Sequence, residues 1–309
     1  MQLESLTDVA FHPTSALGVL KGTFLSFIGG CVWFDVENER LVTPIPHYDF
    51  AFDGYRKIFT PEMMENLPRY ASTITQRYEN LPVLASPYAN NYFHVTLECA
   101  GALRLLGARH PAVAVNPRLR EFLYQDELLG RCLRGRTMVP VEDSAIHVNP
   151  TLFYDYFSRE SVDYVRECMD TFAQPGDDFI YLERKNSNRQ RVEGIAETPE
   201  VLDVLGRYRF RRVDFGAGEL TVSEQIRRMN GARTILAPHG AALTNIIYLN
   251  PPVNLIEVFP PYLATHDCYG EICRILGFSY HPIVVNSYDA DGNMLIDASE
   301  LDRILQACG

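Results

Sequence analysis

The sequence lacks several patterns that would place it in a known class of protein. It has no Gly-x-Gly-x-x-Gly, which argues against a dinucleotide-dependent dehydrogenase, and no Cys-x-x-Cys pair, which argues against a zinc site. No apolar run reaches the length of a membrane span, and the N-terminus has no cationic start followed by an apolar core. Internal repeats and low-complexity segments are also lacking. We therefore expect a globular protein of the cytoplasm.

Positive charge is scarce as well. The chain has 28 Lys and Arg against 39 Asp and Glu, a formal net charge of -11. Such a surface repels nucleic acid and anionic membranes on average, so an anionic ligand must be held by a local basic cluster. The seven cysteines are odd in number. They indicate reduced, mostly buried thiols and not a disulfide framework, with a catalytic cysteine as the open alternative.

The length of 309 residues favours two domains. Short strands are predicted before residue 50, with a hairpin between Thr23–Ile28 and Cys31–Val36. From residue 81 onward, predicted strands and helices alternate, which is typical of a parallel α/β sheet. The sequence Gln174-Pro175-Gly176-Asp177-Asp178 interrupts this pattern. We therefore predict a first domain of residues 1–173 and a second of residues 174–309.

The most informative stretch is TILAPHGAALTNIIYLNPPVNLIEVFP, residues 234–260. It predicts a strand, a tight turn at His239 and Gly240, a helix from Ala241, and a second strand. A helix that begins there without a side-chain cap leaves its first N–H groups available to an anion such as a diphosphate. His239 could add a hydrogen bond or a positive charge, and Asn245 could orient the loop or touch phosphate. The alternative is a plain strand–turn–helix in which the histidine serves as a cap.

Two further features point to the same ligand. Glu257 lies near the end of the second strand, the edge at which open α/β sheets bind ligands, and its carboxylate could accept two ribose hydroxyls. Arg184, Arg189 and Arg191 follow the predicted strand 179–182 with no acidic residue between them. Since an arginine fork binds two phosphate oxygens, we predict a phosphate clamp with Arg184 best placed. A solvated basic loop is the alternative.

A largely apolar helix is predicted over residues 92–106. His94 and Glu98 are four positions apart and share a face of this helix, and Gly101 leaves room above it. A carboxylate on a buried helix is costly unless it is paired or used. The pair is therefore a structural hydrogen-bonded couple, half of a metal site, or a general base with its helper.

Several of these segments together resemble glycosyltransferase family 61, in its compact bacterial form. They are LERKNSNRQRVEG (182–194), LTVSEQI (220–226), HGAALTN (239–245) with the strand that carries Glu257, and NNYFHVTLECAGALRLL (90–106). The resemblance implies an α/β protein of the GT-B type, with two Rossmann-like domains that face each other across a cleft. Residues 1–173 would bind the acceptor and residues 174–309 the nucleotide-sugar donor.

The resemblance also implies a reaction. A sugar would move from a nucleoside-diphosphate sugar, with UDP-sugar expected, to a glycan or lipid-linked saccharide, with inversion, in polysaccharide biosynthesis. Glu98 would accept the proton of the acceptor hydroxyl with His94 as helper. The donor would be held by residues from several segments: Arg184, Arg189, Arg191, His239, Gly240, Ala241, Asn245 and Glu257. Because fixed cations and N–H donors can replace a divalent ion, we expect no metal and no further cofactor.

The sequence departs from the family pattern at two places. Glu183 stands where the family has serine, but alternation along a strand turns it away from Arg184. Ala242, where the family usually has glycine, adds a methyl group near the diphosphate. A nucleotide-sugar epimerase or hydrolase and a catalytically silent nucleotide-sugar-binding subunit are the rival hypotheses. Contact with the inner face of a membrane is compatible with a lipid-linked acceptor.

Overall fold

The structure, a computed structural model, describes residues 4–5, 15–27, 32–43, 59–85, 88–107, 110–141, 145–155, 157–184, 194–216, 218–264 and 267–308. The chain divides into two compact units, residues 1–169 and 170–309. The predicted boundary at 173/174 lies close to this division. Each unit is described by itself.

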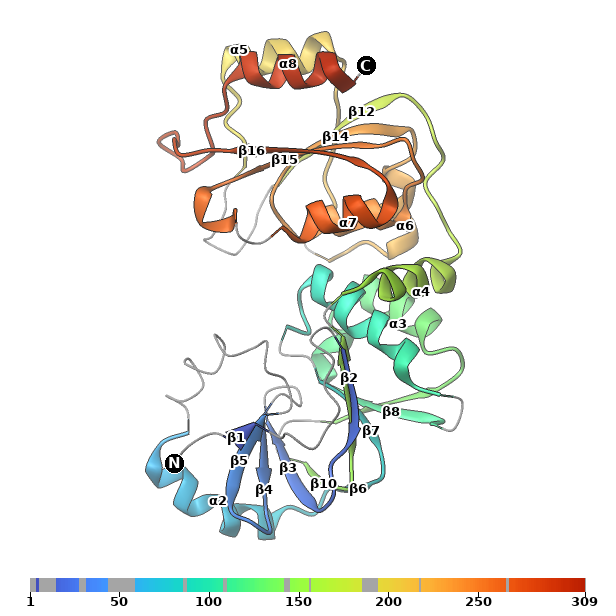
Figure 1. Cartoon of the computed structure of the whole chain (residues 1–309), viewed down its shortest axis with the longest axis vertical. Helices are drawn as coiled ribbons and strands as arrows, with labels where there is room; N and C mark the ends of the chain where they lie inside the picture. Colours follow the sequence, from blue (N-terminus) through green and yellow to red (C-terminus); the bar gives the residue numbers. More distant parts are fainter. Residues whose placement is uncertain are drawn as a thin grey trace. The chain divides into compact units, whose positions relative to one another are not determined.

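The second unit is a three-layer α/β/α fold around one parallel sheet (Figure 1). Its five strands are β12 (Asp178–Leu182), β13 (Arg211–Val213), β14 (Ala232–Pro238), β15 (Asn254–Phe259) and β16 (Ser279–Val284). They lie in the order β13-β12-β14-β15-β16, and all neighbours are parallel. This is a doubly wound order, 2-1-3-4-5, in which the direction of winding reverses between β12 and β14.

Helices cover both faces of this sheet. They are α5 (Pro199–Arg207), α6 (Val222–Arg228), α7 (Cys268–Leu276) and α8 (Ala298–Cys308), with the 3₁₀ segments η5 (Ala241–Tyr248) and η6 (Pro261–Leu263). In Figure 1, α5 and α8 lie above the sheet and α6 and α7 below it. Ile256 and Val258 of β15 join the apolar core under α5 and α8. Because side chains alternate along a strand, Glu257 faces the layer of α7 and η5.

The first unit holds two sheets. A six-stranded sheet has the order β1-β5-β4-β3-β10-β6, and a five-stranded sheet has the order β2-β11-β7-β8-β9. The strands are β1 (Glu4–Ser5), β2 (Ser15–Val19), β3 (Thr23–Phe27), β4 (Val32–Asp35), β5 (Arg40–Thr43), β6 (Arg77–Glu79), β7 (Pro82–Leu84), β8 (Ala112–Val115), β9 (Thr137–Pro140), β10 (Ile146–Val148) and β11 (Thr151–Asp155). The antiparallel pairing of β3 with β4 confirms the predicted hairpin.

The expectation of a Rossmann-like first domain needs correction. The five-stranded sheet is parallel at β11, β7, β8 and β9, as strand–helix alternation predicts. The six-stranded sheet was not expected, and its central pairs β5–β4, β4–β3 and β3–β10 are antiparallel. The chain passes between the sheets at β6–β7 and β10–β11, where Asn80 and Asn149 adopt positive φ angles of 52° and 46°. Asparagine tolerates this left-handed conformation, so two-residue links suffice and no helix intervenes.

The helical elements of the first unit surround these sheets. They are α2 (Pro61–Thr73), α3 (Leu123–Cys132) and α4 (Arg159–Met169), the π-helical segment η2 (His94–Ala100), and the 3₁₀ segments η3 (Leu103–Leu105) and η4 (Pro117–Arg120). Leu67 and Ala71 of α2 pack on the six-stranded sheet, whereas α3 and α4 pack against each other and against η2.

The predicted helix over residues 92–106 is π-helical in its centre. The N–H of Gly101 donates to the carbonyl of Thr96, the hydrogen-bond pattern of a π-helix. The room expected above Gly101 is filled by α4, because a Cβ at Gly101 would lie 2.6 Å from the Cβ of Ser161. Glycine at position 101 therefore permits close packing of η2 on α4. Such π-helical turns are often found at functional sites.

The structure shows where the cysteines and the single tryptophan lie. The six cysteines within the described residues are free thiols, and four of them are buried: Cys99, Cys132, Cys273 and Cys308. Trp33, predicted to lie in a core or at an interface, is fully buried in the first unit. In the part of the chain that the structure describes, the helices are all too short or too polar to cross a membrane.

Candidate functional site

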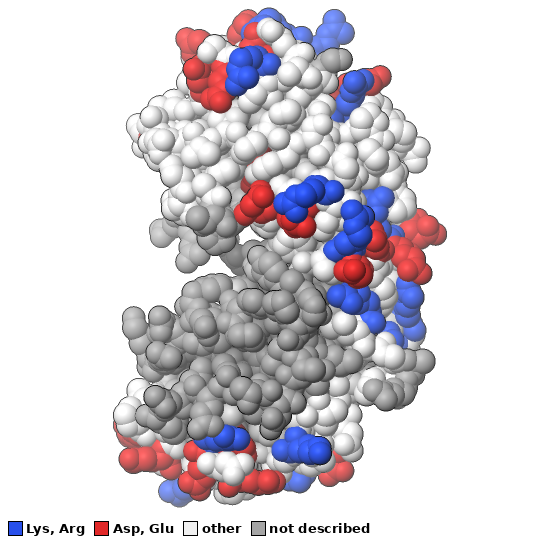
Figure 2. All heavy atoms as spheres, in the orientation of Figure 1, with Lys and Arg blue, Asp and Glu red and all other residues white. Residues whose placement is uncertain are grey.

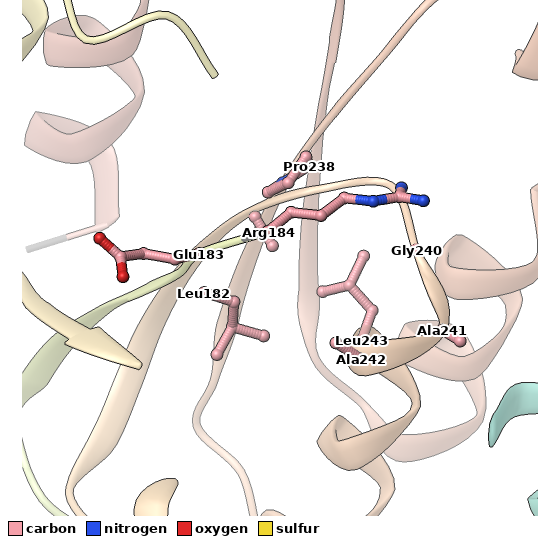
Figure 3. A pocket seen from close by; sticks show the side chains of 9 residues that line it. Leu182, Glu183, Arg184, Pro238, Gly240, Ala241, Ala242 and Leu243 are labelled. Atoms are coloured by element: carbon pink, nitrogen blue, oxygen red, sulfur yellow. The ribbon is translucent and has the colours of Figure 1, made fainter. Parts of the chain in front are cut away.

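A small cavity lies at the carboxyl ends of β12 and β14, where the winding of the second sheet reverses. Its volume is about 130 Å³, and it is lined by Leu182, Glu183, Arg184, Ala237, Pro238, Gly240, Ala241, Ala242 and Leu243 (Figure 3). Open α/β sheets bind ligands at this position. Pockets that hold a whole small molecule measure roughly 300–1,000 Å³, so this cavity fits one part of a ligand, of the size of a phosphate group.

Arg184 follows β12 directly and reaches across the cavity toward Gly240 (Figure 3). Its Nη1 donates a hydrogen bond of 2.7 Å to the backbone oxygen of His239. A Cβ at Gly240 would lie 3.2 Å from this nitrogen, so glycine at position 240 keeps space for the guanidinium. The two segments that the sequence singled out, around Arg184 and around His239, are thus joined in one wall of the cavity.

Glu183 points away from Arg184, as alternation along the strand predicts (Figure 3). Its side chain is nearly buried, and Oε1 accepts a hydrogen bond of 2.6 Å from Nη1 of Arg212, which also bonds Glu197. Arg211 and Arg212 of the edge strand β13 therefore have acidic partners, and on the face in Figure 2 cationic and acidic side chains lie beside one another. Arg189 and Arg191 lie outside the described residues.

The predicted helix after Gly240 is present as a 3₁₀ helix. As predicted, Gly240 provides no side-chain cap. Nδ2 of Asn245 donates to the carbonyl of Ala242 and to Oε1 of Gln225, at 3.0 and 2.8 Å. In an α-helix that carbonyl would accept the backbone N–H of residue 246, so the buried amide favours the tighter turn. Of the two roles expected for Asn245, the contacts support orientation of the loop.

His239 and Glu257 form a hydrogen-bonded couple beside the cavity. Nδ1 of His239 lies 2.6 Å from Oε1 of Glu257, and the side chains are 21% and 3% exposed. The hydroxyl of Tyr280 donates to Oε2 of the same carboxylate at 2.7 Å. Burial and the nearby carboxylate raise the pKa of Tyr280, so this hydroxyl stays protonated and acts as a donor.

These contacts revise the role expected for Glu257. Both of its oxygens accept hydrogen bonds from protein groups, and the carboxylate is buried, which favours orientation of His239 over binding of a ribose. Tyr269 supports the same region from α7. Its hydroxyl donates to the carbonyl of Gly240 at 2.7 Å, and its ring lies 5.4 Å from the His239 ring.

The first unit contains a second couple of the same kind. Nδ1 of His94 lies 2.7 Å from Oε2 of Glu98, with the histidine 24% and the glutamate 6% exposed. The ring of Tyr88 packs on the imidazole at 4.6 Å between centroids. The sequence prediction that these two residues meet is confirmed, although a π-helical turn brings them together.

No group of three or more His, Cys, Asp or Glu residues within the described ranges is arranged to hold a metal ion. One Asp-x-Asp sequence, Asp289-Ala290-Asp291, is present, although the metal-free expectation took such a motif to be absent. The carboxylate of Asp289 accepts hydrogen bonds from the backbone N–H groups of Asp291 and Asn293 and from the amide of Asn293. This carboxylate closes a turn, and independence from metal stays a prediction.

Sequence reasoning missed Tyr269 and Tyr280. Tyr280 lies opposite Leu255 in the register of β15 and β16, so its side chain shares a face with Glu257. That register is not encoded in any local pattern. An aromatic residue next to the predicted strand 281–285 was the one available signal, and Tyr269 gave none beyond its place on a predicted helix.

Fold and site together define a doubly wound α/β protein with a cationic pocket at its switch point. The sequence profile of the family Glycosyltransferase 61 matches residues 47–256, which is well over half of the chain. The chain therefore belongs to glycosyltransferase family 61, and its activity is glycosyl transfer. A comparison with curated proteins found no match.

Proposed function

We propose that the protein transfers a sugar from a nucleoside-diphosphate sugar, UDP-sugar foremost, to a glycan or lipid-linked saccharide. The reaction inverts the anomeric centre, needs no metal ion and belongs to polysaccharide biosynthesis. The observation that carries this proposal is the cavity at the switch point, where Arg184 lies against the backbone of His239 and Gly240.

On the donor side, the cavity suits the diphosphate. The guanidinium of Arg184 supplies charge and forked N–H donors, and the uncapped start of η5 at Ala241 and Ala242 supplies backbone N–H groups. These donors are fixed before the reaction, so they stabilise the charge that develops on the leaving diphosphate without reorganisation. The small cavity accounts for the phosphates, and the nucleoside and the sugar extend beyond it.

His239 assists the same step. Because Glu257 holds Nδ1, the ring orientation is fixed, and Nε2 is the atom that can approach a ligand. The ring meets a phosphate oxygen through Nε2, and the buried carboxylate holds its orientation. Glu257 and Tyr280 are thus positioning residues for His239.

On the acceptor side, the His94–Glu98 couple takes the proton. The acceptor oxygen forms a bond to the anomeric carbon as the bond from that carbon to the diphosphate oxygen breaks, and the hydroxyl proton moves to the couple. Glu98 was expected to be the base. Because His94 is the more exposed member, we assign the proton to its Nε2 and give Glu98 the task of orienting the ring.

A division into a donor unit and an acceptor unit, as in GT-B enzymes, is part of the proposal. The cavity and its supporting side chains belong wholly to the second unit, which would bind the donor, and the His94–Glu98 couple belongs wholly to the first, which would bind the acceptor. A lipid-linked acceptor would bring the enzyme to the inner face of a membrane.

Calorimetry with UDP, GDP, ADP, dTDP and their sugars in EDTA tests the donor site. We expect one nucleoside diphosphate to bind with micromolar affinity and Arg184→Ala to weaken it about 10- to 100-fold, since a charge-assisted hydrogen bond contributes about 1.5–3 kcal/mol. Arg233→Ala is the matched control, because Arg233 pairs with the exposed Asp177. Equal affinity in wild type and Arg184→Ala, or no binding with or without magnesium, would contradict the proposal. Binding without any sugar transfer would favour a silent subunit.

A further inference from the structure

A second cluster of reactive groups lies in the first unit, at the C-terminal ends of α3 and α4. Cys132 is the last residue of α3, and Cys168 lies in the last turn of α4. Packing of α3 on α4 brings them close, because Tyr164 of α4 bonds the carbonyl of Cys132, and Arg134, two residues after Cys132, bonds the sulfur of Cys168. Cys132 is buried, whereas Cys168 is partly exposed. Helix packing therefore brings together one accessible and one protected thiol.

Arg134 is held against the accessible thiol. Its Nε donates to Sγ of Cys168 at 3.4 Å, and its Nη2 pairs with Glu167 at 2.8 Å. The guanidinium carbon lies 4.7 Å from the ring centre of Tyr164, whose hydroxyl donates to the carbonyl of Cys132 at 2.6 Å. Arg134 has a positive φ of 50°, which turns the chain back over α4 directly after α3. The cation is thus placed on the sulfur by three separate contacts.

The electrostatics separate the roles of the two cysteines. The groups that face Cys168 are the Cys132 thiol, Arg134 and Tyr164. Hydrogen bonds from Cys132 and Arg134 and the charge of Arg134 outweigh burial and lower the pKa of Cys168 to about 6. The pKa of Cys132 is raised, because this thiol donates to Cys168 and is buried, although Arg131 and Arg134 oppose the shift. At neutral pH, Cys168 is a thiolate and Cys132 a thiol.

We propose that Cys132 and Cys168 form a dithiol site that reacts with hydroperoxides and closes to a reversible disulfide. The Cys168 thiolate attacks the O–O bond of hydrogen peroxide, which gives a sulfenic acid and hydroxide. The sulfur of Cys132 then attacks the sulfenic sulfur, the S–O bond breaks, and the proton of Cys132 leaves with that oxygen as water. Together the thiolate and the thiol lose two electrons to one peroxide, and one hydroxide and one water form. A low-molecular-weight thiol reverses the reaction by exchange.

The disulfide would join α3 to α4, which both pack against η2, the segment that carries His94 and Glu98. Oxidation would therefore fix the two helices that support one of the histidine couples. This proposal does not depend on the identity of the sugar donor or acceptor.

Two measurements on the full chain test it. In the first, iodoacetamide labelling is followed by mass spectrometry at each cysteine between pH 5 and 9. Cys268 is an internal control, because it is also partly exposed but burial and Glu257 raise its pKa to about 12. We expect Cys168 to react at least tenfold faster than Cys268 at pH 7, with a midpoint near pH 6. Arg134→Gln should move that midpoint upward.

In the second measurement, one equivalent of hydrogen peroxide is added and unreduced peptides are analysed. We expect a Cys132–Cys168 crosslinked peptide in wild type, and in Cys132→Ser a sulfenic acid at Cys168 that dimedone traps. Equal labelling of Cys168 and Cys268 would overturn the reactive thiolate. A dimedone adduct at Cys168 in folded wild type without any crosslink would overturn the pairing.

Discussion

Each unit holds a histidine whose Nδ1 bonds a buried glutamate, and the two couples are assembled in different ways. His94 and Glu98 are four residues apart on one helical segment, at 2.7 Å. His239 and Glu257 are 18 positions apart, at 2.6 Å, on the ends of neighbouring parallel strands, and Tyr280 from a third strand joins them. The first couple depends on one turn of backbone, and the second depends on the register of three strands.

The two couples show that the same histidine–glutamate geometry can be stabilised either by one local turn or by the packing of several strands. In both couples the glutamate is buried and the imidazole is partly exposed, so the carboxylate can fix the ring while the outer nitrogen meets a ligand. The local couple relies on a π-helical turn, which packs on Ser161 through Gly101. The non-local couple needs no unusual backbone, because the pleat already places Glu257 and Tyr280 on one face.

The largest effect is expected when the local couple is broken by Glu98→Gln. Glutamine keeps the size of the side chain but removes the carboxylate that orients His94, and general-base catalysis contributes roughly 10²- to 10⁴-fold. We expect release of nucleoside diphosphate from the donor that calorimetry identifies to slow by about that factor. Donor affinity should not change.

Two controls give this result meaning. Glu121→Gln, an exposed position on the same unit, should leave the rate unchanged. His94→Ala should regain part of its activity with added imidazole if His94 carries the proton. If Glu98→Gln unfolds the protein, the couple is structural, and if it turns over like wild type, Glu98 is neither the base nor needed to orient it.

A third histidine, His147, sharpens the comparison, because it is buried but has no carboxylate as a hydrogen-bond partner among the described residues. His147 is 1% exposed, its Nε2 lies 3.2 Å from the Ser26 hydroxyl, and its Nδ1 has no hydrogen-bond partner among the described atoms. Burial lowers its pKa to about 4. In the unfolded chain His147 binds a proton near pH 6.5, whereas in the folded chain it stays neutral until about pH 4. The free energy of unfolding therefore falls as the pH drops from 6.5 toward 4.

At 1.36 kcal/mol per pKa unit, the cost is about 3 kcal/mol at pH 4. Urea unfolding of wild type and His147→Phe at pH 7 and pH 4 measures it. Phenylalanine preserves ring packing against Trp33 and Tyr78, so we expect the variant to lose about 3 kcal/mol less than wild type over this range. Parallel stability losses in the two proteins would show that His147 is not buried in its neutral form.

The same distinction between local and non-local structure explains what could be predicted from the sequence. The strand, turn and helix around His239 and the pairing of His94 with Glu98 follow from local spacing, and both were predicted. Alternation along β12 also placed Glu183 on the side opposite Arg184, where it meets Arg212. These features depend on backbone periods of a few residues.

What could not be predicted depends on how distant segments pack. The π-helical turn at His94–Ala100, which packs on Ser161 through Gly101, and the 3₁₀ turn of η5, where Asn245 bonds the carbonyl of Ala242, had been expected only as helices of unspecified type. The passage of the chain between two sheets at Asn80 and Asn149 requires knowledge of which strands pair. The contact of Glu257 with Tyr280 could not be foreseen without the register of β16.

The smallest effect is expected when the hydrogen bond from Tyr280 to the His239–Glu257 couple is removed. Tyr280→Phe removes one hydrogen bond to Glu257, which contributes about 1 kcal/mol, so we expect the rate of sugar transfer to fall about fivefold. Glu257→Gln removes the charge behind His239, and loss of such an orienting carboxylate costs roughly 10- to 100-fold. Tyr288→Phe, an exposed tyrosine of the same unit, is the control and should match wild type.

The ratio of these two losses decides between the roles considered for Glu257. If Glu257 orients His239, Tyr280→Phe gives a small loss in rate with unchanged affinity for the nucleoside diphosphate, because Oε1 still bonds Nδ1. If Glu257 instead held a ribose, Tyr280→Phe would free an oxygen for that hydroxyl and tighten binding, and Glu257→Gln would weaken binding more than it slows the reaction. Calorimetry and initial rates on the same four proteins distinguish these cases, since one role appears in the rate and the other in the affinity.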